Sequence, residues 1–79
     1  MLQNSYNHKL TSVRLHELMK DNGYNNSSFA KEVGISEAAI RKLINPDKPF
    51  NPKIETLLSM SAVLNVPIAD IIVFNDDIT

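Results

Sequence analysis

The sequence predicts an all-α domain of five short helices. Apolar residues recur at helical spacing, most clearly in the stripe formed by Ile54, Leu57, Leu58 and Leu64. Glycine, asparagine and proline separate the periodic segments, and these residue types begin or end helices. With 79 residues and 43% apolar content the chain fits one small domain, which buries about 60% of its unfolded surface.

The first helix is expected over residues 12–22, after a polar N-terminal arm of residues 1–10. Thr11 or Ser12 supplies an oxygen for the N-terminal cap. Gly23 can adopt the left-handed conformation that closes a helix.

Residues 27–45 predict two short helices joined by a tight turn at Gly34, the outline of a helix-turn-helix. Asn25 and Ser36 are good N-caps for these two helices. Their apolar stripes comprise Phe29, Ala30 and Val33 in the first and Ile40, Leu43 and Ile44 in the second.

The second helix of this motif offers a row of outward side chains to a DNA groove: Glu37, Ala38, Arg41 and Lys42. Arg41 suits bidentate contact with guanine, and Lys42 suits guanine or a phosphate. Glu37 could accept a bond from cytosine, or pair with Arg41 four residues on, and the pairing is favoured. Ala38 could touch a thymine methyl or serve only as a helix former.

Three prolines in the seven residues after Asn45 predict an ordered loop without regular helix. Lys48 and Lys53 lie in or beside this loop, where they could contact phosphates or simply be solvated. Residues 51–52, an asparagine and a proline, are expected to cap and begin the fourth helix, which Asn65 ends.

The last helix is expected from Pro67 to about Val73, which ends a domain of residues 11–74 before an acidic tail of residues 75–79. This region has more apolar side chains than one short helix can bury, and the surplus predicts a homodimer interface. The expected interface residues are Ile68, Ile71, Ile72 and Phe74, with Val73 and Ile78 adding to the apolar surplus.

The net charge of −1 is unevenly distributed. Residues 25–53 hold five basic residues against three acidic ones, while the remainder holds three against six. Positive charge therefore gathers around the proposed reading helix, although the excess is small.

Several function classes find no support in the sequence. The chain has no cysteine, and His8 and His16 lack a nearby third ligand type, so we expect no metal. Two glycines leave no phosphate-binding loop, and we expect neither a cofactor nor catalytic residues. No segment approaches the apolar length of a membrane span, so a cytoplasmic protein is expected.

The joint pattern of the chain resembles the Cro/C1-type helix-turn-helix family, also called XRE-like or lambda-repressor-like, over residues 10–72. The matching residues are Gly23, Phe29, Ala30, Gly34, Ile35, Ser36, Ile40, Leu43, Pro52, Ile54 to Leu58, and Leu64. The resemblance implies a five-helix bundle whose third helix enters the major groove, with Asn26 and Asn45 holding phosphates. The full set of expected DNA contacts is Asn26, Ser36, Glu37, Ala38, Arg41, Lys42, Asn45, Lys48 and Lys53.

Three departures from the family pattern stand out. Asn26 replaces the usual glutamine and reaches less far towards a phosphate. Met19 and Ile44 occupy positions that often carry an arginine and glutamate pair, a joint swap that avoids an unpaired buried charge. The loop after the third helix is about two residues longer than usual and is similar to loops of antitoxin-type members.

The expected function is a sequence-specific transcriptional regulator that binds double-stranded DNA as a homodimer. A repressor is favoured over an activator because the chain has no second domain to sense a ligand or recruit polymerase. The alternative is an antitoxin-type module that masks a toxin, with operator binding secondary.

Overall fold

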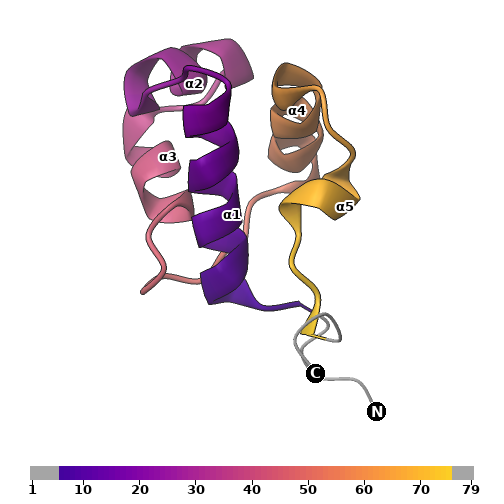
Figure 1. Cartoon of the computed structure of the whole chain (residues 1–79). Helices are drawn as coiled ribbons and strands as arrows, with labels where there is room; N and C mark the ends of the chain where they lie inside the picture. The colour runs from indigo at the N-terminus through magenta and orange to yellow at the C-terminus, as the bar shows by residue number, and fades with distance from the viewer. Residues whose placement is uncertain (1–5, 76–79) are drawn as a thin grey trace.

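Five α-helices build the fold, as a computed structural model that describes residues 6–75 shows (Figure 1). They are α1 (His8–Asp21), α2 (Asn26–Val33), α3 (Glu37–Leu43), α4 (Ile54–Leu64) and α5 (Ile68–Ile71). In Figure 1, α2 and α3 lie on one side of α1, and α4 and α5 lie on the other. The predicted all-α, five-helix architecture is confirmed.

One continuous core joins all the helices. Each contributes at least one side chain that is at most 1% exposed: Leu15 and Met19 from α1, Phe29 from α2, Ile40 from α3, Met60 from α4 and Ile71 from α5. Phe50, in the loop between α3 and α4, is equally buried. The loop is therefore anchored to the core through this ring.

The predicted caps around the helix-turn-helix are confirmed. The side chain of Asn25 accepts a hydrogen bond from the Ser28 N–H at 2.7 Å, and Ser36 accepts one from the Ala39 N–H at 3.1 Å. Gly34 ends α2 with φ of 90°, a left-handed conformation that costs a residue with a Cβ about 1–2 kcal/mol. Asn65 ends α4 in the same region, with φ of 57°.

The start of α1 differs from the prediction. Asn7 caps the helix, so α1 includes residues that were expected to belong to the arm. Thr11 and Ser12, the predicted caps, are instead buried inside the helix. The Thr11 hydroxyl accepts a hydrogen bond from the Val73 N–H at 3.0 Å, so it holds a distant segment that local sequence does not reveal.

The start of α4 and the end of α5 also differ. Residues 51–53 lie outside the helix, and the extended Lys53 (φ −65°, ψ 155°) precedes α4 without a side-chain cap, so the predicted asparagine and proline start is wrong. α5 ends at Ile71 and not near Val73, because the chain there becomes extended and pairs with the N-terminal segment.

The two ends of the described chain meet at the base of the bundle (Figure 1). Tyr6 and Phe74 form an antiparallel bridge, and the Asn7 N–H donates to the Val73 carbonyl at 2.7 Å. Residues 1–5 of the expected arm and 76–79 of the expected tail, Ile78 included, lie outside the described residues. Within residues 6–75, no helix combines the length and apolarity that crossing a membrane requires.

Candidate nucleic-acid interface

α3 presents one apolar face and one polar face. Ile40 and Leu43 are buried against the core, and α2 packs beside them with Phe29, Ala30 and Val33. The opposite side carries four exposed residues, which we call the α3 face: Glu37, Ala38, Arg41 and Lys42. The helix-turn-helix therefore fixes α3 by its buried side and leaves its other side exposed to solvent.

Glu37 and Arg41 form an ion pair on the α3 face. The Arg41 Nη1 lies 2.9 Å from the Glu37 Oε2, with 58% of the arginine and 47% of the glutamate side chain exposed. At that exposure the pair adds little to stability. It orients the guanidinium along the helix, and an arginine has five N–H donors, so donors remain for a base edge.

A polar cleft lies between α1, the start of α2 and the start of α3. It is lined by His16, Lys20, Tyr24, Asn25, Asn26, Ser27 and Glu37. Asn26, a predicted phosphate contact, is half-buried there beside His16 and Lys20 of α1. Neither of these two α1 residues was predicted as a DNA contact. Their spacing of four in the sequence already puts both on one face of α1.

The loop after α3 carries the remaining predicted contacts. The Asn45 Oδ1 accepts a hydrogen bond from the Asp47 N–H at 2.9 Å, which closes a local turn and uses the amide oxygen. Lys48 and Lys53 are exposed.

A groove of about 330 Å³ separates this loop from α3. Its apolar lining comes from Ile35, Ala39, Leu43, Pro49 and Pro52, and both Lys42 and Lys48 line it as well. Two predicted DNA contacts that lie on different elements thus border the same groove.

The positions that often carry an arginine and glutamate pair are apolar in the structure as well as in the sequence. Met19 is 1% exposed, and Ile44 is half-buried against the same core cluster. Met19 and Ile44 therefore replace the ion pair by apolar packing, and neither position carries a buried charge.

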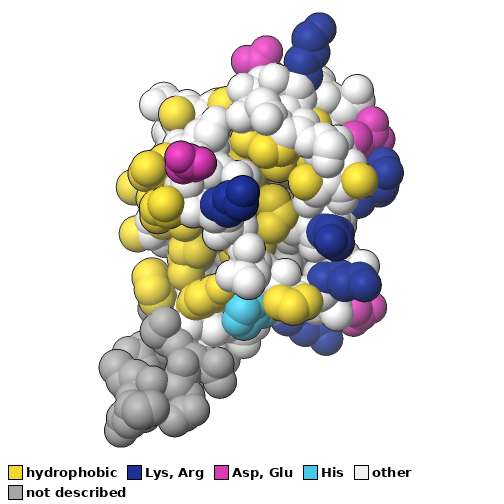
Figure 2. All heavy atoms as spheres, turned by 180° about the vertical axis from the view of Figure 1, so that it is seen from behind, with side chains coloured by type: hydrophobic (Ala, Val, Ile, Leu, Met, Phe, Trp, Pro, Cys, Tyr) yellow, Lys and Arg dark blue, Asp and Glu magenta, His cyan; other side chains and the backbone are white. Residues whose placement is uncertain are grey.

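Charged and apolar side chains separate over the surface. In Figure 2, lysine and arginine gather mainly over the α2–α3 side, and hydrophobic side chains gather over the α4–α5 side. The exposed apolar residues include Ile54 (63%) and Leu58 (54%) on α4 and Phe74 (41%) at the C-terminal end.

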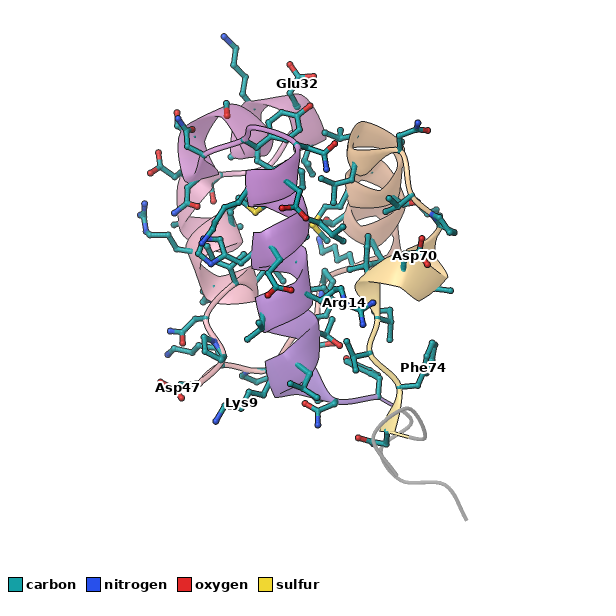
Figure 3. The ribbon with its side chains drawn as sticks, viewed as in Figure 1. Lys9, Arg14, Glu32, Asp47, Asp70 and Phe74 are labelled. Atoms are coloured by element: carbon teal, nitrogen blue, oxygen red, sulfur yellow. The ribbon has the colours of Figure 1, made fainter. Side chains whose placement is uncertain are left out.

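Two of the four predicted dimer contacts belong to the core instead. Ile71 is 0% and Ile72 8% exposed within a single chain, because α5 folds back onto α1. Arg14 of α1 donates to the Asp70 carbonyl at 2.8 Å and holds α5 in that place (Figure 3). Of the four predicted residues, Ile68, which is half-buried, and Phe74, which is exposed, remain accessible to a partner.

Comparisons with known proteins agree with this geometry. A family model described as the Cro/C1-type HTH DNA-binding domain matches residues 14–77. A search of curated proteins found no match.

Similar solved structures include two proteins with this fold. The N-terminal DNA-binding domain of SinR from Bacillus subtilis is 26% identical, with a TM-score of 0.73 over 81% of this chain and 91% of that one. SinR in complex with DNA is 27% identical, with a TM-score of 0.68 over 75% of this chain and 92% of that one. The restriction-modification controller protein C.AhdI from Aeromonas hydrophila shares the fold at 17% identity, with a TM-score of 0.71 over 81% and 92%.

The fold and the α3 face define a helix-turn-helix DNA-binding domain of the kind found in transcription regulators. The family match covers most of the sequence, and the chain belongs to the Cro/C1-type helix-turn-helix DNA-binding family.

Proposed function

We propose that the chain is a small transcriptional repressor that reads a specific sequence of double-stranded DNA with α3 in the major groove. The α3 face carries the proposal, because it combines a fixed helix with exposed side chains that match base edges. The role is binding without catalysis, and the expected place of action is the cytoplasm.

The residues take different roles in this proposal. Arg41 contacts guanine, Lys42 contacts guanine or a phosphate, and Ala38 lies against a thymine methyl. Ser36 and Glu37 begin α3 at the groove. Phosphate contacts come from Asn26, Asn45, Lys48 and Lys53, joined by His16 and Lys20 of the polar cleft.

A homodimer completes the proposal. One small domain contacts too few base pairs to distinguish its site from the many other sites in a genome. A dimer that binds two half-sites doubles the number of base pairs that are recognised. Ile68 and Phe74 are the proposed contacts, and the exposed Ile54 and Leu58 supply further apolar surface on α4. The mass of the free chain in sedimentation at tens of micromolar tests this step: a dimer mass supports it, and a monomer mass contradicts it.

The test is a selection from a random duplex pool at about 0.15 M salt. It compares the natural chain with an Arg41→Ala, Lys42→Ala double variant. The natural chain should enrich an inverted repeat, and the double variant should not.

A Lys9→Ala, Lys31→Ala double variant is the matched control. It loses the same charge from exposed positions on α1 and α2 and should still enrich the repeat. If the natural chain enriches no sequence, the proposal fails.

An antitoxin-type module that masks a toxin is the second candidate. The exposed apolar residues of α4, Ile54 at 63% and Leu58 at 54%, favour it because apolar patches mark protein-binding surfaces. Under this alternative, Ile54→Ser with Leu58→Ser would abolish partner binding, while the Arg41→Ala, Lys42→Ala variant would retain it.

A further inference from the structure

Two side chains of the N-terminal segment hold the backbone of Phe50. The Tyr6 hydroxyl donates to the Phe50 carbonyl, and the His8 Nδ1 accepts a hydrogen bond from the Phe50 N–H at 2.9 Å. The Tyr6 and His8 rings also stack, with centroids 4.4 Å apart and an interplanar angle of 34°. We call this arrangement the Tyr6–His8 clamp.

The clamp is itself fixed to the fold. Tyr6 bridges to Phe74, the Asn7 N–H donates to the Val73 carbonyl at 2.7 Å, and His8 is the first residue of α1. The clamp therefore joins the C-terminal segment and α1 to the loop between α3 and α4. With its ring in the core and its peptide in the clamp, Phe50 is held from both sides.

The clamped loop carries groups assigned to DNA binding. Lys48 precedes Phe50 by two residues, and it borders the same groove as Lys42 of the α3 face. A shift of the Phe50 peptide would move Lys48 relative to α3. We propose that His8 is a positioning residue for the DNA interface, whose neutral form holds the loop in its binding position and whose protonation releases it. This inference rests on the proposed function.

The chemistry of imidazole determines the direction of the effect. A neutral imidazole has one acceptor nitrogen, whereas a protonated imidazole has two donors and no acceptor. Protonated His8 would point a donor at the Phe50 N–H, and the hydrogen bond would be lost. Imidazole side chains change charge in the physiological pH range, so the release is accessible there.

The elements that meet at His8 carry few other charged groups. Tyr6 is stacked on the ring, Lys9 follows on α1, and Asp47 and Lys48 precede Phe50 in the loop, while residues 72–75 carry no charge. Figure 3 shows Lys9 and Asp47 at the same end of the molecule.

The first test compares the DNA affinity of the natural chain with that of His8→Asn between about pH 8 and about pH 5.5, on the selected duplex. The amide oxygen of the introduced asparagine can replace Nδ1 as the acceptor but does not titrate. The affinity of the natural chain should fall relative to the variant by about twofold to tenfold, the range for one hydrogen bond. Because both proteins contain His16, its protonation cancels in the ratio, and a constant ratio would overturn the proposal.

The second test needs no DNA. The NMR signal of the Phe50 amide in the free protein should titrate over the same pH range in the natural chain and in Tyr6→Phe, and stay constant in His8→Asn. If no duplex is selected but the amide titrates, the proposed function fails and the release of the clamp stands. If a duplex is bound but the amide does not titrate, the proposal about His8 fails alone.

Discussion

The two shortest helices, α3 and α5, use their surfaces in opposite ways. α3 has seven residues, buries Ile40 and Leu43, and exposes four polar or small side chains on its other face. α5 has four residues, buries Ile71, and continues into a buried extended segment. A segment rich in apolar residues near the end of the chain can thus complete the core of the same chain. A charged face on a well-capped helix, in contrast, is available to a partner. Substitutions in the two regions should separate these two roles.

The largest effect is expected inside α5. Ile71→Ala should lower the free energy of unfolding by about 2–5 kcal/mol, because it leaves a cavity in a fully buried site. Urea denaturation measures the loss. Ile68→Ala, at a half-buried position of the same helix, is the control and should cost clearly less. Equal losses would contradict the assignment of Ile71 to the core.

The attachment of the C-terminal segment to α1 gives the next largest effect. Thr11→Val should cost about 1–3 kcal/mol of unfolding free energy, because the Val73 N–H then loses its acceptor. Ser12→Ala is the opposite case, since the Ser12 Oγ is buried and has no hydrogen-bond partner among residues 6–75. This second variant should be neutral or stabilising by up to about 1 kcal/mol. Thermal unfolding that ranks the two variants in the reverse order would contradict these roles of the Thr11 and Ser12 hydroxyls.

Among the DNA-binding variants, Lys48→Ala should lower the affinity for every duplex to a similar extent. The loss of one phosphate contact should reduce the slope of log affinity against log salt concentration by about one unit. It should leave the sequence preference unchanged. Titrations of the selected duplex and a scrambled one at several salt concentrations measure both quantities. If the variant instead changed the ratio of the affinities for the two duplexes, Lys48 would be assigned to a base contact.

The smallest effect on stability is expected at the ion pair of the α3 face. Glu37→Gln should change the unfolding free energy by less than about 0.5 kcal/mol, because the pair is exposed. The same variant should tighten binding to scrambled duplex, since it removes a negative charge near phosphates. Loss of binding to all duplexes would show that Glu37 is needed to orient Arg41.

Much of the helix-turn-helix could be predicted because its determinants are local. Asn25, Gly34 and Ser36 act within one helical turn of their position, and the spacing of Ile40 and Leu43 determines which side of α3 is buried. The presence of the outward face follows from that spacing alone.

The rest depends on contacts between distant segments. The position of Thr11 in the sequence is typical of a helix cap, but the hydrogen-bond partner of its hydroxyl is Val73, 62 residues away. The role of His8 depends on Phe50, 42 residues away, and the burial of Ile72 depends on the return of the chain onto α1. No local pattern encodes these pairings, so the start of α1 was mispredicted, and the burial of Ile71 and Ile72 in the core was not foreseen.

The proposed function depends on contacts between the α3 face and base edges. The most direct test measures the affinity of the natural chain, Arg41→Ala and Lys31→Ala for the selected duplex and for every single base-pair variant of it. Arg41→Ala should lose about 1–3 kcal/mol of discrimination between the natural base pair and its substitutes at one position of each half-site, and keep the discrimination at all other positions. Lys31→Ala should keep the natural preference at every position. Uniform weakening of binding by Arg41→Ala, with the natural preference unchanged at every position, would show that Arg41 does not contact a base.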